Sequence, residues 1–211
     1  TLKRVTLELG GKSPNLIFAD ADFESAIDGT CAGIFANSGE VCSAGSRVLV
    51  EKTIYDDAVA SMIDEAARIK VGSGLDPDTT MGPLISSEHR ETVLSYVGSG
   101  RESAAVAYEG AVPSDPGLAG GYFVPPTIFT DVDNSTRIAR EEIFGPVMAV
   151  IPFSDEEDAI RIANDTTYGL AAAVWTSDIK RPMKVARGIK AGVVWVNDSQ
   201  PAPTESIWGG Y

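Results

Sequence analysis

The sequence predicts a three-layer α/β domain, in which a mostly parallel sheet is covered by helices on both faces. Short apolar runs alternate with helical patterns along almost the whole chain, which is typical of this class. The apolar runs are nearly continuous, as expected for strands that are buried on both faces. A length of 211 residues with 44% hydrophobic content can form one substantial core, so we expect a single globular unit.

The predicted strands are short segments rich in apolar and β-branched residues. A Gly/Pro-rich segment, SDPGLAGGYFVPP at 114–126, reads as a surface loop between two of them. The strands are NLIF at 15–18, RVLVE at 47–51, AAVAYEG at 104–110, VMAVIPF at 147–153, AAAVW at 171–175 and GVVWVN at 192–197.

The predicted helices place apolar residues three and four positions apart, so that one side of each helix faces the core. Cys31 falls on the apolar side of the first helix and is expected to be buried. Ser154 and Glu157 form the pattern of a capping box, which places a helix start beside them. The helices run from about residue 22, over 56–69, over 87–97, from 155 and over 184–189.

Charge and composition exclude several classes of function. The 17 basic and 30 acidic residues give a formal net charge of −13, which repels nucleic acid phosphates and anionic lipids. No apolar run reaches the ~20 residues of a membrane-spanning helix, and the first residues show no secretory signal. We therefore expect a cytoplasmic protein with no nucleic acid or membrane partner. Both ends of the chain read as cut from a longer protein.

The sequence lacks the residue patterns of several kinds of active site. His89 is the only histidine, and its charged neighbours in SSEHRETVLSYV indicate a solvated surface residue instead of a catalytic base. Neither C-x-x-C nor H-E-x-x-H occurs, so we expect no metal site. The phosphate-binding patterns G-x-G-x-x-G and G-x-x-x-x-G-K are also missing, and we expect no nucleotide-binding fold within this chain.

Cys42 is the strongest candidate for a reactive group. It lies in FANSGEVCSAGSR at 35–47, where small neighbours leave room for a carbonyl carbon to approach the sulfur. Gly39 and Gly45 let the backbone turn so that amide N–H groups can face a developing oxyanion. Breakdown of the adduct needs a base, and with histidine excluded a carboxylate remains. Glu8, in ELGGK, is the best placed, although a solvated residue at a strand end is the commoner role for such a glutamate.

Three blocks of the sequence, in order, resemble the signature motifs of the aldehyde dehydrogenase superfamily. They are ELGGKSPN at 8–15, FANSGEVCSAGSR at 35–47 and REEIFGPV at 140–147. The resemblance extends through TMGPL, GGYFVPPT, YGLAAAVWT, AGVVWVN and WGGY, and so covers essentially the whole chain.

The resemblance implies roles for the matching residues. Cys42 matches the nucleophile, which forms a thiohemiacetal and then a thioester with a small-molecule aldehyde, while the Cys42 backbone N–H helps to hold the oxyanion. Glu8 matches the general base that activates the hydrolytic water. Glu142 matches the residue that hydrogen-bonds the nicotinamide ribose, and Phe144 the residue that packs beside the nicotinamide. The implied cofactor is NAD or NADP.

Members of this superfamily are typically more than twice as long, so the resemblance implies that residues 1–211 are the catalytic domain alone. The dinucleotide-binding domain, which binds most of the cofactor, and the C-terminal oligomerisation arm are absent from this sequence. We therefore expect little dehydrogenase activity from the isolated chain, and a homo-oligomer in the full-length protein.

The segment VNDSQPAPTESIWGG at 196–210 looks most like the betaine-aldehyde and aminoaldehyde branch. In that branch an aromatic at the position of Trp208 helps to enclose a cationic group. Ala36, however, stands where plant members carry an aromatic, so a general aliphatic or aromatic aldehyde is an equally good expectation.

Two other functions stay open on the sequence. A cofactor-free thiol esterase could use the same Cys42 and Glu8, since a nucleophile and an oxyanion site suffice for activated esters. A packing or interaction domain without activity is the third possibility, because half of an active site can be inert.

Overall fold

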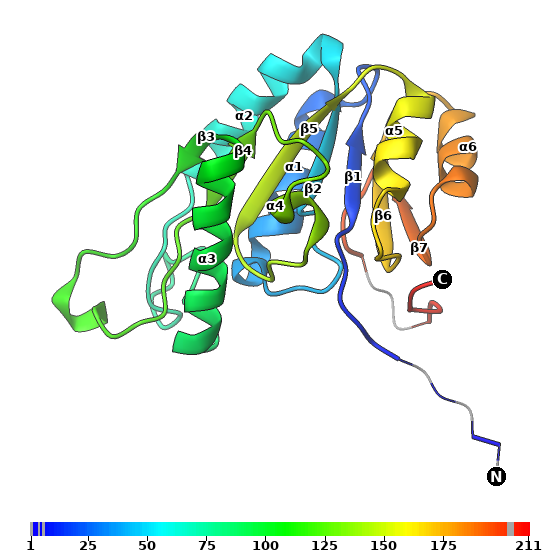
Figure 1. Ribbon diagram of the computed structural model, residues 1–211. Helices are drawn as coiled ribbons and strands as arrows, with labels where there is room; N and C mark the ends of the chain where they lie inside the picture. Colours follow the sequence, from blue (N-terminus) through cyan, green and yellow to red (C-terminus); the bar gives the residue numbers. More distant parts are fainter. Residues whose placement is uncertain (1, 4, 6, 202–204) are drawn as a thin grey trace.

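The computed structural model describes residues 2, 3, 5, 7–201 and 205–211, and it has the predicted three-layer α/β arrangement (Figure 1). The strands are β1 (Pro14–Ile17), β2 (Arg47–Glu51), β3 (Ala105–Glu109), β4 (Thr127–Thr130), β5 (Val147–Phe153), β6 (Ala171–Trp175) and β7 (Val193–Val196). In this part of the chain they form one seven-stranded sheet of order β3-β4-β5-β2-β1-β6-β7. All neighbours are parallel except β3, which runs antiparallel to β4 at one side of the sheet.

Helices cover both faces of the sheet. They are α1 (Phe23–Phe35), α2 (Tyr55–Ala67), α3 (Ser87–Ser103), α4 (Arg137–Arg140), α5 (Glu156–Asn164) and α6 (Arg181–Gly188). One face packs against α1 and α2, and the other against α3 to α6 (Figure 1). Among the described residues, none of these helices combines the length and apolar character needed to cross a bilayer.

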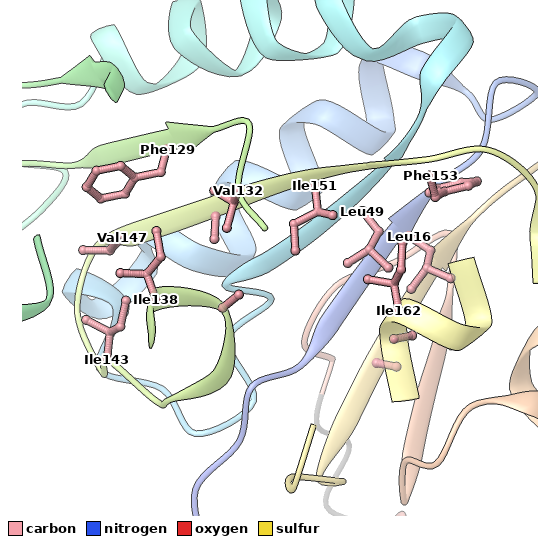
Figure 2. Close-up of a cluster of buried hydrophobic side chains, with 14 of the residues drawn as sticks. Leu16, Leu49, Phe129, Val132, Ile138, Ile143, Val147, Ile151, Phe153 and Ile162 are labelled. Carbon is pink, nitrogen blue, oxygen red and sulfur yellow. The ribbon is translucent and has the colours of Figure 1, made fainter. Parts of the chain in front are cut away.

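Each face of the sheet has its own core, because successive residues of a strand point to opposite sides. In β2, Leu49 faces α3 to α6, whereas Val48 and Val50 face α1 and α2. Figure 2 shows the first of these cores, with Leu49 and Ile151 on adjacent strands. Burying one such side chain stabilises the fold by about 1.5–3 kcal/mol.

Most predicted elements are confirmed, and the misses have local causes. β2, β5 and β6 have the predicted bounds, and Cys31 is buried on α1. The sequence did not predict β4 or α4, which are four residues each; α4 is a single turn and too short for a helical period to show. α3 continues to Ser103, beyond the predicted end at residue 97, through the glycine-containing stretch GSGRES.

The capping box predicted from Ser154 and Glu157 is wrong by one residue. Asp155 is the N-cap of α5, and its Oδ1 accepts from the backbone N–H of Asp158 at 2.9 Å. Asp158 Oδ2 in turn accepts from the backbone N–H of Ser154 at 3.0 Å. A carboxylate is favoured over a hydroxyl here because its charge also interacts with the helix N-terminus.

The strand order brings the three sequence blocks to one edge of the sheet. The register pairs Pro14 of β1 with Arg47 of β2, and Arg47 with Ala149 of β5. Because β1, β2 and β5 are adjacent and parallel, the segments that precede them lie together at the edge where these strands begin. Those segments are the three blocks, and we call this the amino edge of the sheet.

Candidate active site

The first block lies directly against both of the others. The backbone N–H of Gly11 donates to Glu142 Oε1 at 3.1 Å, which joins the first block to the third. A Cβ on Gly11 would collide with the backbone carbonyl of Cys42, so only glycine permits this approach to the second block. The three motifs therefore form one site at the amino edge.

The nucleophile loop, residues 36–42, has a strained backbone. Asn37, Ser38 and Gly39 have φ angles of 50°, 58° and 74°, in the left-handed region. Such conformations cost about 1–3 kcal/mol for residues other than glycine and persist only where contacts hold them. Ser38 Oγ donates to Gly82 O at 2.9 Å. Gly39 packs so closely on Gly145 that a Cβ would collide with its backbone, which joins the second block to the third.

Cys42 carries a free and partly exposed thiol in this loop. It packs against a buried apolar cluster of Leu170, Ala171, Ala173 and Trp195. The Cys42 backbone N–H donates to no backbone acceptor among the described residues, so it is available to a bound oxyanion. The other thiol differs, because burial raises the pKa of Cys31 to about 12 and keeps it protonated at neutral pH.

The Glu8 carboxylate is held by the C-terminal segment. Trp208 Nε1 donates to Glu8 Oε2 at 2.9 Å. Trp208 also packs against the same apolar cluster as Cys42, and its ring centroid lies 6.0 Å from that of Trp195. No hydrogen bond joins Glu8 to Cys42 in the described part of the chain. The two are related through Trp208, which binds Glu8 and packs against the same apolar cluster as Cys42.

A cleft of about 730 Å³ lies beside these residues. Its walls come from the N-terminal segment, the stretch before β6 and the C-terminal segment, and they include Leu9, Leu170 and Trp208. Cys42 does not line this cleft; the two are related through Leu170, which belongs both to the cleft wall and to the apolar cluster against which Cys42 packs.

Glu142 is half-buried and fixed at one oxygen. Burial raises the pKa of its carboxyl group, while the Gly11 N–H and the Lys12 side chain act in the opposite direction. The backbone N–H of Glu142 points to the Tyr168 hydroxyl at 3.4 Å. Glu142 Oε2 accepts no hydrogen bond from the residues described, which leaves one carboxylate oxygen for an external donor.

Phe144 presents its ring at the surface and also has a left-handed backbone, with a φ of 56°. Its side chain is among the exposed large apolar groups, at 37%. The ring meets His89 edge to face, with centroids 5.8 Å apart. The interpretation of His89 as a solvated residue is therefore wrong, since its side chain is only 21% exposed and lies within the site. The charged residues beside His89 in the sequence suggest full exposure, and they do not show that one side of the imidazole packs against the protein.

Lys12 is a second residue whose importance the sequence did not show. Its side chain is 1% exposed, and Nζ has no hydrogen-bond partner among the described residues. Burial lowers the pKa of Lys12 to about 7, and the nearby Arg47 guanidinium acts in the same direction, against the carboxylates of Glu142 and Glu141. An unpaired buried ammonium destabilises the folded state.

We expect stability to rise with pH because of Lys12. The unfolded chain holds this proton up to its ordinary pKa of 10.5, whereas the folded chain releases it near 7. Between these values the unfolded state binds more protons, so the free energy of unfolding increases by up to about 1.4 kcal/mol per pH unit. Below pH 7 Lys12 is protonated in both states, so the folded state bears the full free-energy cost of the buried ammonium group. Lys12→Met should be more stable than the native chain at neutral pH and should lack this rise, as measured by urea unfolding.

The exposed Lys190, which lies beside Lys12 in the fold, gives a matched control. Lys190→Met also removes one positive charge, but one that is exposed to solvent, and should leave the pH profile of the free energy of unfolding unchanged. If Lys12→Met and the native chain keep the same slope between pH 7 and 10, Lys12 is not the source of the dependence.

No metal-binding cluster of His, Cys, Asp or Glu occurs among the residues that the structure describes. The residues that the sequence analysis singled out near the amino edge are a thiol, two carboxylates and an exposed aromatic ring. Fold and site together define a class of thiol-bearing α/β domain in which the reactive loop precedes a central strand.

Comparison with known proteins identifies the family. A model described as "Aldehyde dehydrogenase family" matches residues 1–211, and the chain belongs to this family. It is 48% identical over 211 residues to the betaine aldehyde dehydrogenase of Bacillus subtilis, and 50% identical to that of Brucella anthropi. In both cases the match covers 100% of this chain and 43% of the relative, so the chain spans less than half the length of these relatives.

Solved structures give the same result for the fold. The betaine aldehyde dehydrogenase of Staphylococcus aureus in complex with NAD+ superposes with a TM-score of 0.93 at 48% identity, over 97% of this chain and 41% of that one. The NAD+ complex of an aldehyde dehydrogenase from Bacillus cereus also gives 0.93 at 48% identity, over 99% and 42%. The prediction of an aldehyde dehydrogenase catalytic-domain fold is confirmed.

Proposed function

We propose that this chain is the catalytic domain of an NAD(P)-dependent aldehyde dehydrogenase that oxidises an aldehyde to a carboxylic acid. The observation that carries the proposal is the meeting of the three blocks at the amino edge. There the Cys42 backbone touches Gly11, Gly11 binds Glu142, and Glu8 is tied to Trp208. The names of the relatives support the same reaction.

In the proposed mechanism the Cys42 thiolate attacks the aldehyde carbon and forms a C–S bond, while the carbonyl oxygen becomes an oxyanion held by the Cys42 N–H. Loss of hydride from this carbon leaves a thioester on Cys42. Glu8 then takes a proton from water, whose oxygen attacks the thioester carbon. The C–S bond breaks, and the acid and the thiol are released.

The residues present fit a nicotinamide nucleotide, which when bound supplies the hydride acceptor. Glu142 Oε2 has no donor among the described residues and can accept from a ribose hydroxyl. The exposed Phe144 ring offers a flat apolar surface to an aromatic heterocycle. We infer that most of the remaining cofactor contacts come from a dinucleotide-binding domain beyond this sequence, in a full-length cytoplasmic enzyme that forms a homo-oligomer.

For the substrate we propose an aldehyde with a quaternary ammonium group, of the betaine aldehyde type. Trp208, which is only partly buried and packs against the same apolar cluster as Cys42, can offer its aromatic face to a cation, a contact that contributes about 0.5–2 kcal/mol to binding. The relatives named betaine aldehyde dehydrogenase support this choice.

The test compares two aldehydes of the same shape with the full-length enzyme. Betaine aldehyde and 3,3-dimethylbutanal differ only in the charge of the trimethyl group. We expect kcat/KM for dinucleotide reduction to be about tenfold higher for betaine aldehyde, as a cation–π contribution of this size predicts. Equal values would refute the cationic substrate but keep the dehydrogenase, whereas no reduction with any aldehyde would refute the dehydrogenase itself.

A further inference from the structure

His89 lies where the nucleophile loop and the third block come closest to α3. It is in the first turn of that helix, where its backbone N–H donates to the N-cap hydroxyl of Ser86 at 3.1 Å. The cap fixes the helix start, and the imidazole reaches from it into the site. The proposed chemistry does not use this ring, so its contacts need a separate explanation.

The imidazole Nε2 contacts both loops at once. It lies 2.6 Å from the backbone oxygen of Phe144 and 3.6 Å from Oε1 of Glu40. Because a carbonyl oxygen can only accept, Nε2 must carry the hydrogen in this contact. Glu40 Oε1 also accepts from the backbone N–H of Ile85 at 3.2 Å, so the carboxylate is fixed at the start of α3.

Both partners of His89 belong to strained segments. Phe144 has a left-handed backbone, and Glu40 directly follows the left-handed run at residues 37–39. Conformations of this kind persist where surrounding contacts determine them. The hydrogen bond from His89 fixes the orientation of the Phe144 peptide group. The same Nε2 lies 3.6 Å from Glu40 Oε1 and forms an ion pair with it when the imidazole is protonated, which links that peptide to the loop that carries Cys42.

We propose that His89 is a positioning residue that joins Phe144 to the nucleophile loop through Glu40. It holds the Phe144 backbone in its left-handed conformation and thereby sets the place of the Phe144 ring relative to the Cys42 thiol. This inference rests on the proposed function, in which Phe144 packs beside the nicotinamide and Cys42 attacks the substrate. His89 itself touches neither the aldehyde nor the transferred hydride.

The experiment uses two substitutions in the full-length enzyme. His89→Leu removes the donor, while His89→Gln keeps an N–H group that can reach a carbonyl oxygen. We expect His89→Leu to raise the dissociation constant of the dinucleotide about tenfold and to change the rate at which iodoacetamide labels Cys42 without cofactor. His89→Gln should restore both values to within about threefold of the native enzyme. Ser95→Ala, at an exposed position of α3, is the matched control and should change neither.

A second experiment repeats the substitution in the Phe144→Gly variant, and it separates a loss of positioning from a loss of folding or of direct cofactor contact. Glycine adopts positive φ without support, so in Phe144→Gly the backbone no longer needs His89. Adding His89→Leu to this background should then have no further effect on the dinucleotide dissociation constant. A further tenfold loss there, or native values of both readouts in His89→Leu alone, would overturn the proposal. A native enzyme that reduces no dinucleotide would instead refute the proposed function.

Discussion

Cys42→Ala is expected to abolish aldehyde oxidation, with kcat lowered by on the order of 10⁴-fold or more. The side chain is the nucleophile that attacks the aldehyde in the proposed mechanism, and alanine can form neither the thiohemiacetal nor the thioester. The loop around it should remain folded, because the close contacts at Gly11 and Gly39 involve backbone atoms that the substitution leaves in place.

The measurement is steady-state dinucleotide reduction by the full-length enzyme, together with mass spectrometry after iodoacetamide treatment. Cys31→Ala is the matched control, because it removes the other thiol, whose pKa of about 12 keeps it unreactive. It should retain activity and single labelling at Cys42. Oxidation that survives Cys42→Ala would contradict the assignment of the nucleophile, and hydrolysis of an activated ester that survives it would also exclude the thiol esterase alternative.

Glu8→Gln is expected to separate the two halves of the reaction. The amide cannot take a proton from water, so hydrolysis of the thioester should slow by about 10²–10⁴-fold. Formation of the thioester does not require this base in the proposed mechanism. The first turnover should therefore release about one equivalent of reduced dinucleotide per site in a burst, followed by a slow steady state.

Stopped-flow absorbance measures the burst, and trapping of the acylated Cys42 by mass spectrometry identifies its product. The glutamine oxygen can still accept from Trp208 Nε1, so the local structure is retained. Glu157→Gln, which removes an exposed carboxylate from α5, should show native kinetics. If Glu8→Gln slows the burst and the steady state equally, the base acts before the thioester forms.

The core and the strands were the parts of this fold that the sequence predicted best. The run VMAVIPF is apolar throughout and RVLVE has an apolar centre, and they form the strands β5 and β2 with the predicted bounds. Elements decided by a few residues were predicted less well. The start of α5 depends on whether Ser154 or Asp155 is the N-cap. The two choices differ by one residue, and the hydrogen bonds that decide between them are seen only in the folded structure.

The sequence suggested the chemistry of the candidate site but not the residues that support it. Roles for Cys42 and Glu142 could be proposed because their motifs are local, and these roles stay predictions. The surroundings of Lys12 and His89 could not be predicted, because they depend on what lies beside these residues after folding. Burial lowers the pKa of Lys12, helped by the charge of Arg47, which is distant in sequence, and the contacts of His89 come from two loops that are also distant in sequence.

The placement of the site has a consequence for protein engineering. Glu8, Cys42 and Glu142 all precede strands of the parallel sheet, so the turns that follow β1, β2, β5 and β6 lie at the opposite end of the sheet. Ligand sites in open parallel sheets are usually found at that opposite end. Here the turn between β1 and α1 is itself fixed, because Asp20 accepts from Thr176 and Arg181 and Asp22 is the N-cap of α1, so a peptide tag inserted at that end of the sheet must leave these two residues in place.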